Sequence, residues 1–176
     1  MSALSSWWSS TDGPEIAQGD FLSECLVPIL PDGFGPTSQP VHIVTRPGSL
    51  IVVTQSCDLA NVKSGLVALC PITSIVEFEV ENPTFAKRGV WEEVRKGRRE
   101  GLYLLASPTN PTVSRETLVV NFRETYSLPL GYLQCHAISL GPRWRMQSPF
   151  LEHFSQAFAR FFMRVGLPSM IPPFAD

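Results

Sequence analysis

The stretch that decides the fold is RPGSLIVVTQSCDLANVKSGLVALCPITS, residues 46–74. It contains two continuous apolar runs, Leu50 to Thr54 and Leu66 to Cys70, and the first of them is rich in β-branched residues. Runs of this length and composition predict strands that are buried on both faces. The segment between them, from Gln55 to Ser64, is polar and predicts a connection that leads back into the second strand. Pro71 is expected to end that strand.

The composition of the whole chain agrees with a fold built from short strands. The chain has 176 residues, of which 44% are hydrophobic and 17% are charged, and its formal net charge is −2. These values exclude global disorder, and they exclude a protein coated in positive charge for nucleic-acid binding. The 16 prolines and 12 glycines disfavour a bundle of long helices.

Patterns outside the central stretch predict further strands and two helices. Strands are expected at residues 21–30, 41–45, 75–81, 102–106, 117–122 and 132–140. A charged helix is expected at about 84–99. A C-terminal helix is expected at about 149–165, where phenylalanines recur at helical spacing and would pack on the sheet. The predicted fold is therefore mainly β with α, an SH3-like small barrel that carries a C-terminal amphipathic helix.

The predicted organisation is a single domain with a short leader. Residues 1–17 are Ser-rich and are expected to form a flexible N-terminal arm, and residues 18–176 are expected to form one barrel domain in which 84–99 is a basic helical insertion. No apolar run is long enough to span a bilayer, and the N-terminus lacks the pattern of a secretory signal. With four cysteines and no CxxC pair, the chain is predicted to be a cytoplasmic protein with reduced thiols and no membrane contact.

The central stretch, taken with Gly19-Asp20, resembles the MazF/PemK family of toxin ribonucleases. In that family a Gly-Asp pair opens the first strand, an Arg-Pro pair precedes an apolar strand, and an Asn and a Gly lead into a second strand that ends in Pro-x-Thr-Ser. The matching pieces are Gly19-Asp20, Arg46-Pro47, Asn61, Gly65 and Pro71-Ile72-Thr73-Ser74. The resemblance covers roughly residues 18–133.

This resemblance implies an SH3-like barrel that acts on single-stranded RNA. Members of the family cleave RNA without a metal or cofactor, and the ribose 2′-hydroxyl is the internal nucleophile. An arginine balances the charge of the scissile phosphate and a Ser or Thr hydroxyl assists, and the matching positions are Arg46 and Thr73. The implied partners are RNA, a protein antitoxin and a second copy of the chain.

The polar turn after the first buried strand is a second candidate site. It comprises Gln55, Ser56, Cys57 and Asp58, followed by Asn61. One interpretation is a structural turn in which Cys57 is a small buried residue; another is a pocket that binds a ligand or nucleotide. Weaker alternatives make Cys57 a nucleophile activated by His136 or His42, or a zinc ligand together with Asp58, His136 and Cys25 or Cys70.

Positive charge gathers in the predicted insertion. Six of the 14 cationic residues lie there, namely Lys87, Arg88, Arg95, Lys96, Arg98 and Arg99. They are either a solvated helix face paired with Glu92 and Glu93, or a patch that contacts RNA phosphates. The Arg143-Trp144-Arg145 segment is a second basic and aromatic spot, for which base stacking and packing against the last helix are both open.

These observations lead to one main hypothesis and two rivals. The main hypothesis is an RNA-binding or RNA-cleaving protein of a toxin–antitoxin or defence system, in which Arg46 and Thr73 carry cleavage. The first rival is a barrel without catalysis that binds a protein partner through residues 55–61 and the helical face. The second is an enzyme that depends on the thiol of Cys57 or on zinc.

Overall fold

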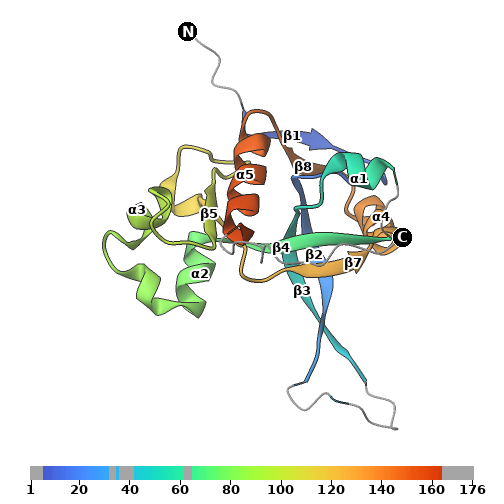
Figure 1. The fold of residues 1–176 in the computed structure, drawn as a ribbon, viewed down its shortest axis with the longest axis horizontal. Coiled ribbons are helices and arrows are strands. Elements are labelled where there is room, and N and C mark those ends of the chain that lie inside the picture. The colour runs from blue at the N-terminus through green and yellow to red at the C-terminus, as the bar shows by residue number, and fades with distance from the viewer. Residues whose placement is uncertain (1–5, 32–34, 36–41, 62–64, 164–176) are drawn as a thin grey trace, which may run out of the picture.

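The structure is a computed structural model that describes residues 6–31, 35, 42–61 and 65–163. Its elements follow the chain in the order β1 (Trp8–Thr11), β2 (Asp20–Ile29), β3 (Val44–Val52), α1 (Ser56–Ala60), β4 (Leu66–Ser74), α2 (Ile75–Glu81), a 3-10 turn η1 (Pro83–Ala86), α3 (Val90–Arg95), β5 (Leu102–Leu105), η2 (Ser114–Glu116), β6 (Leu118–Asn121), β7 (Tyr126–Pro129), α4 (Leu130–Leu140), β8 (Arg143–Met146) and α5 (Phe150–Phe162). The fold is mixed β and α (Figure 1).

The strands form one eight-stranded sheet in which neighbouring strands are antiparallel. The strand order is β1-β8-β2-β3-β4-β6-β5, and β7 pairs with β4 beside this path. Within the described residues, the end strands β1 and β5 do not pair with each other, so the sheet is open along this path. The predicted C-terminal helix packs on the sheet as α5, whereas closure into a barrel is not seen.

The two buried strands predicted from the central stretch are present as β3 and β4, but with other bounds. Residues 44 and 45 belong to the same strand as the first apolar run, and Pro71 does not end the second strand, which continues to Ser74. They pair over Leu50, Ile51 and Val52, which face Pro71, Cys70 and Leu69 respectively. The side chains of β3 alternate between two cores: Leu50 and Val52 join the core beneath α4, and Ile51 joins the core beneath α5. This double burial is the physical reason for the uninterrupted apolar run.

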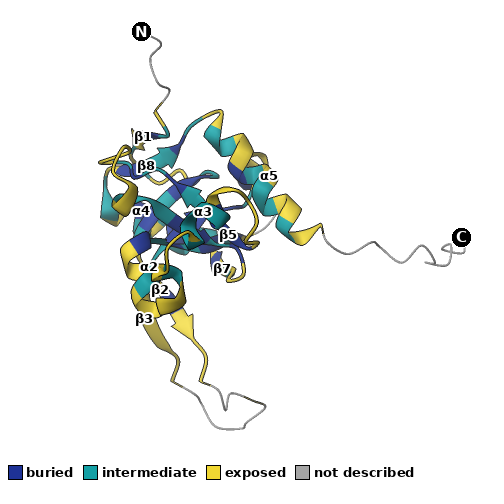
Figure 2. Cartoon of the chain, turned by 90° about the vertical axis from the view of Figure 1, so that its left-hand side faces the viewer, coloured by how far each residue is buried: buried dark blue, intermediate teal, exposed yellow. Residues whose placement is uncertain are grey.

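Helix α5 covers one face of the sheet through a cluster of aromatic rings. The Phe154 side chain has no exposed surface, and its ring lies 5.6 Å from that of Phe122 and 5.7 Å from that of Tyr103, centroid to centroid. Figure 2 shows the buried inner face and exposed outer face of this helix. The predicted end of the helix at residue 165 lies outside the described residues.

Two segments predicted as strands are helices. Residues 75–81 form α2, because Ser74 and Glu77 make a capping box: the Ser74 hydroxyl accepts a hydrogen bond from the Glu77 amide at 3.1 Å, and the Glu77 carboxylate accepts one from the Ser74 amide at 2.8 Å. Residues 132–140 belong to α4. Its buried residues, Leu133 and Ala137, are four apart and therefore share one helix face.

The regions predicted as an N-terminal arm and as a single helical insertion contain a strand and two short helical segments, respectively. Trp8–Thr11, predicted as part of the arm, form β1 and pair with β8, and the Trp8 indole donates a hydrogen bond to the Ala106 carbonyl at 2.7 Å. Residues 1–5 lie outside the described part. The insertion at 84–99 is divided into η1 and the short α3, because Gly89 adopts a left-handed conformation between them.

The outer half of the β2–β3 pair projects from the body as a two-stranded ribbon (Figure 1). Here Val27 pairs with Arg46 and Ile29 with Val44, whereas β4 pairs only with Leu50, Ile51 and Val52 of β3. One edge of β3 is therefore not covered by β4 between Val44 and Ser49. This uncovered edge positions the candidate site described next.

Candidate active site

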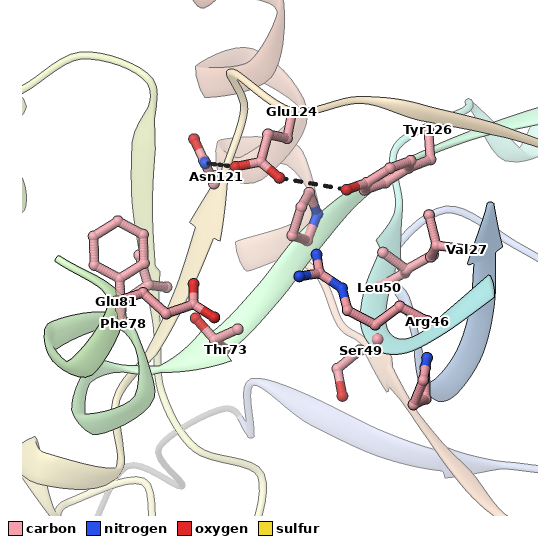
Figure 3. A pocket seen from close by; sticks show the side chains of 14 residues that line it. Val27, Arg46, Ser49, Leu50, Thr73, Phe78, Glu81, Asn121, Glu124 and Tyr126 are labelled. Atoms are coloured by element: carbon pink, nitrogen blue, oxygen red, sulfur yellow. Dashed lines mark hydrogen bonds between the residues drawn. The ribbon is translucent and has the colours of Figure 1, made fainter. Parts of the chain in front are cut away.

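Arg46 extends from the uncovered part of β3 into a pocket of about 210 Å³ (Figure 3). The pocket lies between β3, the end of β4, helix α2 and the β6–β7 connection. Its lining includes Thr73 of β4 and Glu81 of α2, so the two predicted catalytic side chains, Arg46 and Thr73, share one cavity. The polar members of the lining are Arg46, Ser49, Thr73, Glu81, Asn121, Glu124 and Tyr126.

A chain of hydrogen bonds fixes the wall of the pocket beside the Arg46 guanidinium. The side-chain amide of Asn121 donates a hydrogen bond to one carboxylate oxygen of Glu124 at 2.9 Å, and the Tyr126 hydroxyl donates to the other at 3.4 Å. Asn121 ends β6 and Tyr126 begins β7, so the tight connection between these strands brings the three side chains together. Glu124 therefore presents an ordered carboxylate to the pocket.

The environment of Tyr126 keeps its hydroxyl protonated. Burial raises the pKa of Tyr126, and the nearby Glu124 carboxylate raises it further, whereas Arg46 acts in the opposite direction. The hydroxyl is therefore a hydrogen-bond donor at neutral pH. The influence of Arg46 on this pKa also reflects how close the guanidinium lies to Tyr126, as Figure 3 shows.

The apolar part of the pocket is provided by the sheet and by helix α2. Thr73 pairs with Val119 of β6 in the register of β4, and Val119 and Phe78 line the pocket beside it. Helix α2 is held close by Glu79, which accepts hydrogen bonds from the Trp91 indole at 2.7 Å and from both terminal nitrogens of Arg115. These contacts lower the pKa of Glu79, led by its bonds to Arg115.

Sequence reasoning did not identify Glu81, Asn121, Glu124 or Tyr126. The last three lie within six residues, and a cluster of polar side chains between two strands was the only signal that could have found them. Glu81 was hidden because residues 75–81 were predicted to form a strand. A strand gives no reason to expect a carboxylate facing Thr73.

The polar turn at residues 55–61 does not line this pocket. Residues 56–60 form helix α1 at the other end of β3, where the Ser56 hydroxyl accepts a hydrogen bond from the Gln18 amide at 3.1 Å. The Asn61 amide donates to the Cys57 carbonyl at 2.6 Å, which closes the helix. The structure leaves Gln55, Ser56 and Cys57 exposed. Asp58 is partly exposed and interacts with another group of the protein.

Cys57 has no metal-binding or catalytic surroundings in the described residues. Its thiol contacts the Gln55 side-chain oxygen at 3.6 Å, while His136 is bonded through Nε2 to the Ser23 carbonyl at 2.7 Å. No group of three or more His, Cys, Asp or Glu side chains in the described residues is placed to hold a metal ion. Burial raises the pKa of Cys25 to about 12 and that of Cys70 to about 11. These two thiols are therefore protonated at neutral pH.

The six basic residues of 87–99 are separated into paired and unpaired cations. Arg95 and Lys96 form ion pairs with Glu92, at 2.7 and 3.4 Å, and Arg98 pairs with Glu93 at 3.1 Å. The pairs of Arg95 and Lys96 with Glu92 are helix-face pairs of the kind that the sequence suggested, whereas Arg98 lies beyond α3. The Arg99 guanidinium carbon lies 5.2 Å from the centre of the Phe85 ring. For Lys87 and Arg88, which are exposed, no ion pair is found among the described residues.

The Arg143-Trp144-Arg145 segment has a structural role. The Asp20 side chain is fully buried and pairs with both arginines, at 3.2 Å to Nη2 of Arg143 and 2.9 Å to Nη2 of Arg145. Arg143 also donates to the Gly13 carbonyl at 2.8 Å. Both guanidinium groups are thus held by Asp20 and by backbone carbonyls, and Trp144 packs against the core that contains Phe154 of α5, as in the packing alternative for this segment.

Comparisons with known proteins give no match: no family model, no curated protein and no solved structure is similar to this chain. Within the described ranges, none of the helices combines the length and apolarity required to cross a lipid bilayer.

Proposed function

We propose that the protein is a divergent MazF/PemK-type RNA-binding protein that cleaves single-stranded RNA without a metal at the Arg46 pocket. The observation that carries this proposal is the presence of Arg46 and Thr73, matched independently to the family's catalytic positions, in one cavity. The open sheet would correspond to a loosened form of the family's SH3-like barrel. Glu124 and Tyr126, which also line the pocket, would add a proton acceptor and a hydrogen-bond donor to Arg46 and Thr73.

The proposed reaction uses the RNA's own nucleophile. The ribose 2′-oxygen forms a bond to phosphorus while the bond from phosphorus to the 5′-oxygen breaks, and the products are a 2′,3′-cyclic phosphate and a 5′-hydroxyl. Glu124 would take the 2′-hydroxyl proton, and the leaving 5′-oxygen would take a proton from water. Arg46 would balance the charge that develops on the non-bridging oxygens.

Tyr126 and Thr73 would assist as hydrogen-bond donors. The raised pKa of Tyr126 keeps its phenol protonated, and when substrate is bound the hydroxyl would turn its one proton from Glu124 to a non-bridging oxygen beside Arg46. Thr73 lies on another strand of the lining and offers a second neutral donor. Because these groups stand on paired strands, their positions are fixed before substrate binds, which is the condition for electrostatic catalysis.

The test is cleavage of single-stranded RNA in the presence of EDTA, with the product ends identified by mass spectrometry. We expect the wild type to give 2′,3′-cyclic phosphates and to leave DNA of the same sequence intact. Arg46→Ala should lower the rate by about 100-fold or more, because one preorganised charge-stabilising group is lost. Thr73→Val should lower it less.

Arg98→Ala is the matched control, because this arginine is exposed, is paired with Glu93 and does not line the pocket. It should cleave like the wild type. Equal RNA survival with the wild type and with Arg46→Ala would refute catalysis at this pocket. Retained cleavage by Arg46→Ala, with loss in an unrelated variant, would move the active site elsewhere.

A second candidate function, a protein-binding module, is supported by the β2–β3 ribbon. Beyond the body of the sheet, the ribbon exposes five large apolar side chains: Leu26, Ile29, Leu30, Ile43 and Val44. They occupy both faces, since alternate residues of a strand point in opposite directions. Exposed apolar patches of this kind mark contact surfaces. The occupant that we propose is a second copy of the chain, because each copy would offer the other the same apolar surface.

A further inference from the structure

We propose that a second cavity, along the free edge of β5, binds a nucleoside phosphate unit. This cavity measures about 530 Å³, which lies within the range of about 300–1,000 Å³ typical of small-molecule sites. It lies between the end of α3 and the outer end of α5. Its lining combines cationic side chains, aromatic rings and the backbone of an edge strand, which are the three kinds of group that a nucleotide requires.

The cationic groups come from two separate elements. The lining contains Arg95, Arg99 and Arg160 and a single acidic residue, Glu100. Arg95 is neutralised by its two hydrogen bonds to Glu92, each 2.7 Å long. For Arg99 and Arg160, no carboxylate partner is found in the described part of the chain. Two guanidinium groups are thus available for phosphate oxygens, to which arginine binds in a bidentate manner.

The aromatic groups form the inner wall. Tyr103, Phe122 and Phe161 line the cavity, and the Tyr103 ring is stacked on Phe122 with 5.9 Å between centroids. Gly101 also lines the cavity and has φ +84°; a Cβ there would lie 2.7 Å from the Arg123 side chain and 3.1 Å from the Phe161 ring, so this position requires glycine. Burial raises the pKa of Tyr103, so its hydroxyl is a neutral donor, and no hydrogen-bond partner for it is found among the described residues.

The backbone of β5 supplies hydrogen-bonding groups directed into the open edge. β5 is the last strand of the sheet, and the Phe122 amide bonds the Gly101 carbonyl at 2.8 Å. Because bonding to a partner strand alternates along an antiparallel pair, Leu102 and Leu104 direct their N–H and C=O groups away from β6. A nucleobase edge carries donors and acceptors that can pair with these backbone groups, whereas a simple anion cannot pair with a backbone C=O group.

A free nucleotide and a nucleotide within an RNA strand share this chemistry. The experiment that separates them is isothermal titration calorimetry at low salt. The probes are the four ribonucleoside 5′-monophosphates, the corresponding nucleosides, inorganic phosphate, an uncleavable deoxyribonucleotide oligomer and a poly-glutamate peptide. We expect at least one monophosphate to bind more tightly than its nucleoside and than phosphate. Tighter binding of the oligomer than of the monophosphates would identify a strand as the source.

Variants assign this binding to the cavity. Arg160→Gln and Arg99→Gln should each weaken monophosphate binding by about tenfold, because one charge-assisted contact is lost. Both residues are exposed, so folding should not be affected. Arg98→Gln is the matched control and should bind like the wild type.

Three outcomes overturn the proposal: no monophosphate binds, binding is the same in both arginine variants, or only the acidic peptide binds. The result is independent of cleavage at the first pocket. Arg46→Ala should lower the rate of RNA cleavage by about 100-fold or more and leave monophosphate binding unchanged, so either proposal can fail alone.

Discussion

Asp20 has no exposed surface, yet it carries a carboxylate among the strands β2 and β8. It is tolerated because Arg143 and Arg145 both bond to it and because the Ala17 amide donates to it at 3.1 Å. A buried ion pair of this kind contributes little net stability, whereas removal of one partner leaves an unpaired buried charge. The Gly19-Asp20 pair that contributed to the family resemblance therefore has a local structural function.

Asp20→Ala is expected to destabilise the protein by about 3–5 kcal/mol, because the Arg143 guanidinium would remain buried without its partner. Urea unfolding followed by circular dichroism measures this change. Glu93→Ala is the control: its pair with Arg98 is exposed, so the loss should be below about 1 kcal/mol. A similar, small effect of both substitutions would contradict the structural function assigned to Asp20.

The raised pKa values of the Cys25 and Cys70 thiols predict that the free energy of unfolding falls at alkaline pH. Burial raises their pKa values from the ordinary 9.0 to about 12 and about 11. Below pH 9 the thiols are protonated in both states and this contribution is fully present. As pH rises from 9 toward 11 and 12, the unfolded chain releases protons that the folded protein retains, so the free energy of unfolding falls.

The expected loss at pH 10 is about 1.4 kcal/mol per thiol, measured by urea unfolding between pH 7 and pH 10.5. The variant Cys25→Ala with Cys70→Ala should show a shallower decline above pH 9, although it starts from lower stability. Parallel pH curves for the variant and the wild type would show that these thiols do not ionise differently in the two states.

At the scale of elements, α5 shows how a local pattern becomes a packing contact. Its phenylalanines follow helical spacing in the sequence, and the structure distinguishes between them: Phe154 is fully buried, whereas 57% of Phe162 is exposed. Phe154 contacts Tyr103 and Phe122, so the helix holds the strands that also line the β5 cavity. The helix thus connects core stability to the shape of that cavity.

Phe154→Ala is expected to cost about 3–5 kcal/mol, because a large side chain is lost from a site without exposed surface. Phe162→Ala, on the same helix, should cost less than about 1 kcal/mol. Thermal unfolding of the two variants beside the wild type makes the comparison. If Phe162→Ala were the more damaging change, the orientation of α5 on the sheet would be wrong.

At the scale of the whole molecule, the projecting β2–β3 ribbon is the exception to a well-covered sheet (Figure 2). A two-stranded ribbon is only marginally stable by itself, and its exposed apolar residues favour association. We expect the wild type to form dimers at micromolar concentration, measured by size-exclusion chromatography with light scattering. Leu26→Ser with Val44→Ser should shift the equilibrium to monomers.

The matched control is Val80→Ser, an apolar residue of α2 that is 77% exposed and is not part of the ribbon. It should not change the oligomeric state. A wild type that remains monomeric, or dimers that persist in the ribbon variant, would exclude self-association through this surface.

The sequence alone determined the elements whose cause is local. The double-sided burial of β3 and β4 follows from uninterrupted apolar runs, and α5 follows from a strong helical repeat, so both could be predicted. Local rules failed at α2 and α4. In α2 the Ser74–Glu77 capping box outweighed a weak alternation, and in α4 the apolar residues fit either period.

Only the tertiary structure decided which polar residues meet. Arg46 and Thr73 could be selected as a pair only through a family resemblance, while Glu124 and Tyr126 join them because β6 and β7 both pair with β4. The same holds for Arg99 and Arg160, which come from distant segments and line one cavity at the edge of β5. Pairing between strands that are far apart in the chain places such groups together. No local sequence pattern predicts this proximity, because it does not depend on the residues next to each group in the sequence.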